Sequence, residues 1–289
     1  MKRPLFVSLL SFFTNLYPPL VYAQEKTETT STDSASDAVE VQSELGVLGV
    51  VNHRIMYSRE NTHFDYVKEG GQDNLVTFQR YTAEMKMDDG ARLRFVYQPL
   101  ELRSRTALRR DILVDNVPFA AGTPTQFVYS FPYYRGTYLW ETWKSDRTTL
   151  HLGLGLQIRN AKTEFQTLDG KTLVSNRGVG PVPLLALTLG YRLSPTLALE
   201  FEAEGNHASS AILNGDDADE TTGALIDTSL KLSSQINQRF RTFASVRYIS
   251  GGSRGTTRER DNSTGDGFSS NWIDLAAVSV GLVANLDAF

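Results

Sequence analysis

The chain has no cysteine, and it has no long uninterrupted apolar run that would make a good membrane-spanning helix. Without cysteine it can form neither disulfides nor thiolate metal sites, so its stability must come from packing or from a closed hydrogen-bonded sheet. Hydrophobic residues make up 40% of the 289 residues, and charged residues make up 21%. We also find no nucleotide, haem or zinc motif, so the sequence predicts no cofactor and no bound metal.

The first 23 residues have the pattern of a secretory signal peptide. Met1-Lys2-Arg3 is basic, an apolar segment runs from Leu5 to Leu20, and Val21-Tyr22-Ala23 suits signal peptidase. We expect a signal peptide over 1–23, with cleavage after Ala23. Loss of its two basic residues would change the formal net charge from −4 to −6. A mildly acidic protein of this kind is not expected to bind nucleic acid.

Residues 24–43 are rich in Ser, Thr, Glu, Asp and Ala and lack periodic hydrophobicity. This composition predicts a disordered linker, because such a segment cannot bury enough apolar surface to fold. From residue 44 to residue 289 the pattern is different, and we assign this region to a single β-barrel domain.

In this second region apolar and polar residues alternate in short segments. The clearest segment places Leu150, Leu152, Leu154, Leu156 and Ile158 on one face and His151, Gly153, Gly155, Gln157 and Arg159 on the other. A period of two residues predicts a β-strand. Most of the later segments are close to the roughly 9–11 residues that a tilted strand needs to cross a bilayer. The earlier segments alternate less regularly, and the segment 45–57 has no clear parity.

Ten strands are predicted, separated alternately by short turns and long loops. The strands are expected at 45–57, 75–88, 91–104, 127–143, 148–165, 180–193, 196–209, 222–235, 238–250 and 270–287. The long loops are expected at 58–74, 105–126, 166–179, 210–221 and 251–269. Short turns at one end and long loops at the other are typical of bacterial membrane barrels. An even strand count would place both ends of the mature chain on the periplasmic side.

Residues 44–289 resemble the outer-membrane β-barrel proteins in this architecture, and Asp111–Trp143 resembles a family of uncharacterised Gram-negative barrels. The resemblance implies a closed antiparallel up-and-down transmembrane β-barrel, most simply with ten strands, although eight or twelve remain alternatives. It implies location in the cell outer membrane, in contact with its lipids and lipopolysaccharide. The terminal Phe289 resembles the signal that the barrel-assembly machinery recognises. A soluble sandwich is the alternative fold.

The barrel interpretation assigns the two faces of each strand to different surroundings. Apolar positions would face lipid, and Tyr133, Tyr134, Tyr138, Trp140, Trp143, Tyr191, Tyr248 and Trp272 would suit the aromatic girdles at the membrane interfaces. Charged residues of both signs would face the lumen. The expected lumen network is Arg94, Arg135, Glu141, Arg159, Arg192, Glu200, Glu202, Glu204 and Arg247, with Arg80, Lys86, Arg92, Lys231, Arg241, Glu84 and Asp227 as further inward candidates.

Charges enclosed in a narrow barrel must pair with one another. An ionic plug that holds the barrel rigid is therefore the first interpretation, and a small polar pore lined by Arg and Glu is the second. The corresponding functional hypothesis is non-catalytic: a scaffold whose outer loops bind partners, or a narrow pore.

A second hypothesis is enzymatic. His207 continues the outward row of its strand and Ser209 follows it, which resembles the lipid A 3-O-deacylases, in which a His activates a Ser nucleophile. The resemblance implies that His207 is the base and Ser209 the nucleophile, with Glu220 orienting the imidazole. Ser210 stands where that family has Asn, and a His and a Ser are also common where a strand enters the headgroup region. The residues of an omptin-type protease site cannot be assembled from this sequence.

Overall fold

The computed structural model describes residues 38–209, 221–256 and 265–288. The predicted signal peptide, residues 24–37 of the predicted linker, Glu220 and Phe289 lie outside these ranges. The strands of the barrel are β1 (Ala38–Tyr57), β3 (Leu75–Lys86), β4 (Arg92–Gln98) continued by β5 (Glu101–Ala107), β8 (Pro124–Ser130) continued by β9 (Tyr133–Lys144), β10 (Thr148–Thr167), β11 (Leu173–Arg192), β12 (Leu197–Ser209), β13 (Thr221–Gln235), β14 (Phe240–Thr256) and β15 (Phe268–Asn285).

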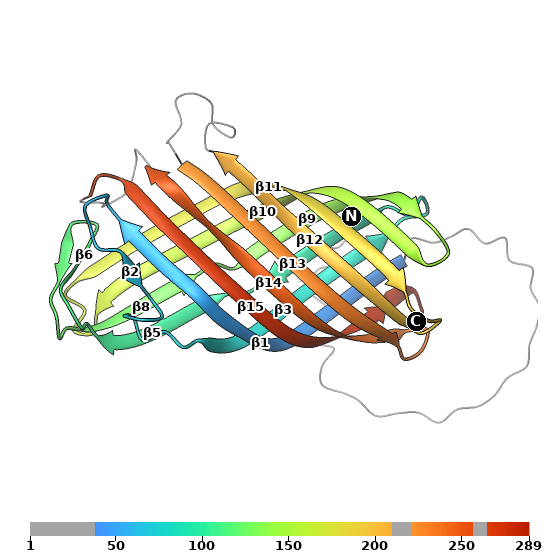
Figure 1. The fold of residues 1–289 in the computed structure, drawn as a ribbon, viewed down its shortest axis with the longest axis horizontal. Coiled ribbons are helices and arrows are strands. Elements are labelled where there is room, and N and C mark those ends of the chain that lie inside the picture. Colours follow the sequence, from blue (N-terminus) through green and yellow to red (C-terminus); the bar gives the residue numbers. More distant parts are fainter. Residues whose placement is uncertain (1–37, 210–220, 257–264, 289) are drawn as a thin grey trace, which may run out of the picture. The chain divides into compact units, whose positions relative to one another are not determined.

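Every strand of this series pairs antiparallel with its neighbours, and the first pairs with the last. β1 pairs with β3 on one side and with β15 on the other, so the sheet closes on itself. Because β5 continues β4 as one strand of the barrel wall, and β9 continues β8 as another, the closed barrel has ten strands, as predicted. Figure 1 shows them strongly tilted. Closure satisfies the backbone hydrogen bonds without leaving an open edge.

The turns and loops differ between the two ends of the barrel. At one end the turns are short, as between β9 and β10 or between β11 and β12, and we call it the short-turn end. The opposite, long-loop end carries β2 (Phe64–Asp65) and the hairpin of β6 (Ile112–Val114) and β7 (Val117–Phe119). A 3-10 helix, η1 (Leu286–Ala288), follows β15. No helix in the described ranges is long and apolar enough to cross a membrane.

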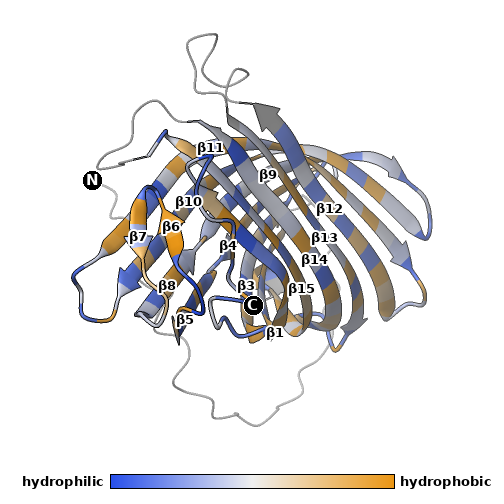
Figure 2. Ribbon diagram, turned by 60° about the vertical axis from the view of Figure 1, so that its left-hand side comes forward, coloured by the Kyte–Doolittle hydropathy of each residue, from blue (hydrophilic) through white to orange (hydrophobic). Residues whose placement is uncertain are grey.

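The outer surface carries the predicted rows of apolar side chains. Coloured by hydropathy, the strands show apolar residues that alternate with polar ones (Figure 2). Leu154, Leu185 and Val278 are 55%, 68% and 65% exposed, whereas Ala186 and Ser279, which follow the last two in the sequence, are buried. Most of the proposed girdle aromatics are exposed as well: Tyr134, Trp140, Trp143, Tyr191, Tyr248 and Trp272. Tyr138 is half-buried, and Tyr133 faces the interior and is buried.

Three predicted boundaries are corrected. β1 begins at Ala38, so residues 38–43 belong to the sheet and not to a linker ending at 43. The loop predicted at 166–179 is mostly strand, because β10 and β11 extend into a long hairpin whose turn spans 168–172. The strand predicted to end at 250 continues to Thr256. Polar residues in these extensions made them resemble loops, although they pair regularly with their neighbours.

The unclear parity of the first strand has a structural cause. The pairing of β1 with β15 shifts between Val50 and Asn52, which is a β-bulge. A one-residue insertion exchanges the inward and outward faces of the strand. Outward positions are therefore odd-numbered up to Val51, and Arg54 then points outward.

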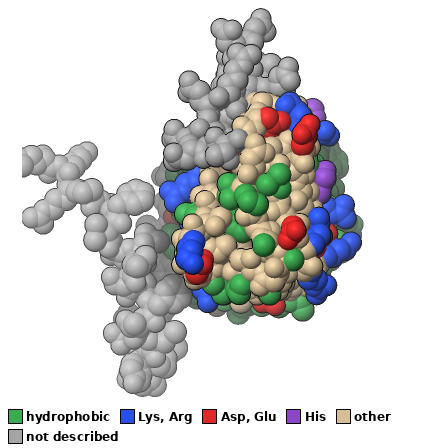
Figure 3. Space-filling model, turned by 90° about the vertical axis from the view of Figure 1, so that its left-hand side faces the viewer, with side chains coloured by type: hydrophobic (Ala, Val, Ile, Leu, Met, Phe, Trp, Pro, Cys, Tyr) green, Lys and Arg blue, Asp and Glu red, His purple; other side chains and the backbone are tan. Residues whose placement is uncertain are grey.

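The interior near the long-loop end is apolar, which the sequence analysis did not predict. One buried cluster includes Phe64, Phe127 and Phe165, and a second, closer to the middle, includes Leu48, Phe78 and Leu275. Figure 3 looks onto this end and shows apolar side chains at its centre, with charged side chains around the rim. The strands that line these clusters are apolar on the inner face, so their alternation is weak.

Candidate functional site: the charged interior

The middle of the barrel is filled by a network of buried charged side chains centred on Asp227 of β13. Its carboxylate contacts three guanidinium groups, at 2.6 Å for Arg247, 3.1 Å for Arg135 and 3.2 Å for Arg80. These side chains come from β14, which is the neighbour of β13, and from β9 and β3, so two of the three contacts cross the lumen. None of the four side chains is more than 3% exposed.

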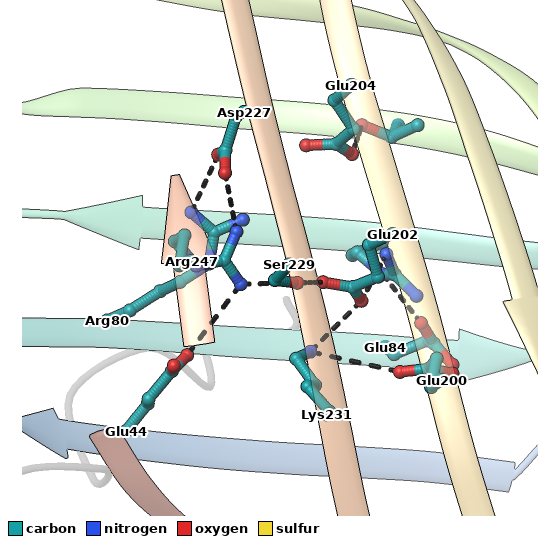
Figure 4. Close-up of polar contacts among 12 residues, drawn as sticks. Glu44, Arg80, Glu84, Glu200, Glu202, Glu204, Asp227, Ser229, Lys231 and Arg247 are labelled. Carbon is teal, nitrogen blue, oxygen red and sulfur yellow. Dashed lines mark hydrogen bonds and ion pairs between the residues drawn. The ribbon is translucent and has the colours of Figure 1, made fainter. Parts of the chain in front are cut away.

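Two glutamates of β12 extend the network from Asp227 towards the short-turn end (Figure 4). Glu204 pairs with Arg135, and Glu202 contacts Arg94 at 2.9 Å and Lys231 at 3.0 Å. Ser229 also donates a hydrogen bond to Glu202, at 3.0 Å. Alternation along β12 places both glutamates on the inner face, where they are buried.

Glu84 and Glu44 complete the network on the other side of the lumen. Arg94 donates to Glu84 at 2.7 Å. Glu44 of β1 accepts a hydrogen bond from Ser279 and lies 3.9 Å from Arg247. Glu44 was not among the predicted inward residues, because the first strand was predicted to begin at residue 45.

We call these ten buried residues the charge layer. They are Arg80, Arg94, Arg135, Lys231, Arg247, Glu44, Glu84, Glu202, Glu204 and Asp227. With five cations and five carboxylates, the charge layer is formally neutral. Isolated charges are very costly in a low-dielectric interior, and neutral pairing with several contacts per group is the arrangement that makes their burial tolerable.

The remaining members of the predicted network lie outside this layer. Glu200 lies at its edge, 3.8 Å from Lys231 and 3.9 Å from Arg92. Glu141 pairs with Lys144 near the short-turn end. Arg192 is exposed at the end of β11. The side chain of Arg159 lies outside the described part of the structure.

His53 and His151 are buried in structural positions. His53 stacks on Tyr66 with 4.1 Å between ring centroids, and its Nδ1 lies 2.7 Å from Gln72 Oε1. His151 Nε2 lies 3.1 Å from the carbonyl oxygen of Gly90, in the turn between β3 and β4. Gly90 has φ +82°, and an added Cβ there would lie 2.8 Å from the Glu141 carboxyl carbon. Glycine thus lets Glu141 pack against the turn.

The short-turn end of the lumen holds a cavity of about 410 Å³. The charge layer contributes Arg94, Glu202 and Lys231 to its lining, the turn after β9 contributes Arg147, and the end of β11 contributes Arg192. Among the described residues, no group of three or more His, Asp or Glu side chains is arranged to hold a metal ion.

The proposed catalytic residues are only partly described. His207 is exposed on β12, in register with Ala224 of β13. The backbone of Ser209 pairs with Thr222, but its side chain, like the whole of Glu220, lies outside the described part. The contacts that a Ser–His pair would need are therefore not observed.

No protein-family model and no curated protein matches the sequence. Similar solved structures are those of outer-membrane β-barrel proteins. The outer membrane protease OmpT from Escherichia coli is 9% identical, with 89% of this chain and 100% of that chain covered and a TM-score of 0.46. The transport unit of the autotransporter AIDA-I from Escherichia coli is 7% identical (89% and 93% covered, TM-score 0.39). The toluene transporter TodX from Pseudomonas putida is also 7% identical (87% and 90%, TM-score 0.34).

Proposed function

We propose that the chain is an integral outer-membrane protein of non-catalytic type, a closed barrel that holds a binding surface at the outside of the cell. The observation that carries this proposal is the filled lumen. The charge layer crosses the middle of the barrel with almost no exposed surface, and two apolar clusters fill the interior beyond it.

The outer surface supports insertion in a membrane. Exposed Leu, Val and Phe side chains recur on the strands all around the barrel, as in Leu154, Leu230 and Val280. A water-soluble barrel would not expose so much apolar surface, whereas a bilayer would solvate it favourably. In the orientation typical of bacterial barrels, the short-turn end faces the periplasm and the long-loop end faces outward.

The long-loop end is built as a rigid surface. Phe64 and Phe127 pack with 4.9 Å between ring centroids, which attaches the loop after β1 to the wall of the barrel. Arg110 pairs with Glu69 at 2.9 Å and so links two long loops. Such preorganisation lowers the entropic cost of binding a partner. We infer that the described parts of the loops bind a ligand or a protein outside the cell.

A conductance measurement distinguishes the closed barrel from the alternative, a narrow pore. The refolded mature protein should give no current steps in a planar bilayer, because the side chains of the charge layer leave no continuous water-filled path. Insertion is first verified by protease protection in vesicles, and the same detergent without protein is the control. Reproducible current steps from protein with verified insertion would contradict the closed barrel.

The lipid A acyl hydrolase remains the second candidate function. The exposure of His207 on the outer face of β12 favours it, since a base for lipid hydrolysis must face the bilayer. Expression in a Gram-negative host should then remove an acyl chain from lipid A, and Ser209→Ala and His207→Ala should each abolish the loss. Unchanged lipid A mass spectra in cells that contain the folded wild-type barrel would exclude this activity.

A further inference from the structure

The cavity at the short-turn end carries an excess of positive charge. Its lining contains eight cationic residues, Lys86, Arg92, Arg94, Lys144, Arg147, Arg192, Lys231 and Arg241. It contains five acidic residues, Glu40, Glu84, Asp146, Glu200 and Glu202. The lining therefore has a formal charge of +3, of which one charge, that of Lys144, is paired with Glu141 outside the lining, although the chain as a whole is acidic. This excess sets the cavity apart from the neutral charge layer beside it.

Part of the excess arises where two cations share one carboxylate. Lys86 Nζ lies 2.5 Å from one oxygen of Glu40, and Arg241 Nη2 lies 2.9 Å from the other. Glu40 is therefore the shared counter-charge of two cations. One positive charge at this side of the cavity is left without a counter-charge.

Two further cations lie on the opposite wall. Arg147 and Arg192 are both exposed, and within the described ranges neither has a carboxylate within ion-pair distance. Their backbones are joined, because the N–H of Arg192 donates to the carbonyl oxygen of Arg147 at 2.7 Å. The closed sheet thus places Arg147 and Arg192 side by side in the lining of the cavity.

An independent observation points to a missing acceptor. Gln42 lines the cavity, and its side-chain nitrogen Nε2 is buried without a hydrogen-bond partner in the structure. A buried donor of this kind is costly unless a ligand or solvent accepts its hydrogen bond. An anion in the cavity can accept this hydrogen bond once the Gln42 side chain turns towards it.

We propose that this cavity binds a small soluble polyanion with two or three carboxylate or phosphate groups. Guanidinium groups suit such ligands because they donate paired charge-assisted hydrogen bonds to planar or tetrahedral anions. The volume lies within the range of small-molecule sites, and a charged cleft with low-dielectric walls concentrates anions. The charge layer contributes a preorganised floor. This site is separate from the surface proposed at the long-loop end and does not depend on it.

The test is isothermal titration of the refolded full-length mature barrel with citrate, pyrophosphate and acetate at low ionic strength. Citrate or pyrophosphate should bind at least about tenfold more tightly than acetate, which corresponds to about 1.4 kcal/mol. Preference between citrate and pyrophosphate distinguishes a carboxylate ligand from a phosphate ligand. Binding should weaken as salt is added, because the attraction is electrostatic. Equal affinity for all three anions, or no detectable binding, would overturn the proposal.

Variants locate the binding within the molecule. Arg147→Gln combined with Arg192→Gln should weaken polyanion binding by about tenfold or more. Lys68→Gln combined with Lys171→Gln removes the same charge from the long-loop end and should leave affinity unchanged. Gln42→Leu should also weaken binding, and a heat-dependent gel shift verifies that each variant is folded. If both double variants behave alike, the anion is attracted by net charge and the proposed site is wrong.

Discussion

At the scale of single residues, Asp227 has three ionic partners in the charge layer, as Glu202 and Arg247 also do. Three guanidinium groups from three different strands converge on its two oxygens. Removing one member of a buried ionic network leaves its partners uncompensated, and this costs more than the lost contact itself. The network therefore links strands that are not neighbours in the barrel through one carboxylate.

Asp227→Asn should lower the free energy of unfolding by about 3–5 kcal/mol, since it leaves the surrounding arginines with one negative charge too few. The measurement is urea-induced unfolding from lipid vesicles. Asp146→Asn, an identical chemical change in an exposed turn, should change stability by less than about 0.5 kcal/mol. Equal effects of the two substitutions would show that Asp227 is not electrostatically important.

The contribution of a buried aromatic residue to the free energy of unfolding can be tested in the same way. Phe127 is 1% exposed in the cluster near the long-loop end, while Leu154 faces outward and is 55% exposed. Phe127→Ala should destabilise the protein by about 3–5 kcal/mol through cavity formation. Leu154→Ala should cost less, because lipid can fill the space. A larger effect at Leu154 would contradict the assignment of inner and outer faces.

At the scale of elements, the hairpin of β10 and β11 is the longest in the barrel, with both strands spanning 20 residues. Its turn is organised around Asp169. Thr167 Oγ1 donates to the Asp169 carboxylate at 2.7 Å, and the N–H of Lys171 donates at 3.1 Å. Gly170 supplies the positive φ of +74° that the turn needs.

These hydrogen bonds make the turn sensitive to acid. The hydroxyl of Thr167, followed by the N–H and ammonium of Lys171, lowers the pKa of Asp169 to about 2. Because the folded-state pKa is depressed, this contribution to stability is complete above the ordinary Asp pKa of about 3.9 and is lost as the pH falls through about 2. Carboxyl NMR titration should show the low midpoint. Thr167→Val should raise it and Thr167→Ser should preserve it, whereas an unchanged midpoint in Thr167→Val would contradict the stated cause.

At the scale of the whole molecule, the barrel is closed by the pairing of β1 with β15, which joins residues near the two ends of the chain. A closed sheet can unfold only by breaking many hydrogen bonds together. Unheated protein should therefore migrate differently from boiled protein on a denaturing gel. Identical mobility before and after boiling, in a preparation with native β-sheet circular dichroism, would contradict a stable closed barrel.

Several features of this molecule were predictable from local sequence alone. The row of leucines from Leu150 to Leu156 predicted both a strand and its outward face, because side chains alternate regardless of which strands lie beside them. The same rule placed Arg94, Glu202 and Arg247 inside. Alternating turn lengths predicted the number of strands. Where a bulge or an apolar inner face interrupted the pattern, as in β1 and β8, the local signal failed.

The sequence by itself therefore determined the strands, the closed class of fold and the presence of charges of both signs in the lumen. Only the tertiary structure decided which charges meet, that apolar side chains close the long-loop end, and that unpaired cations gather at the other end. The physical reason is that alternation is a local property of the backbone. Contacts across the lumen join residues far apart in sequence, such as Glu44 and Ser279, and depend on the register of every strand between them.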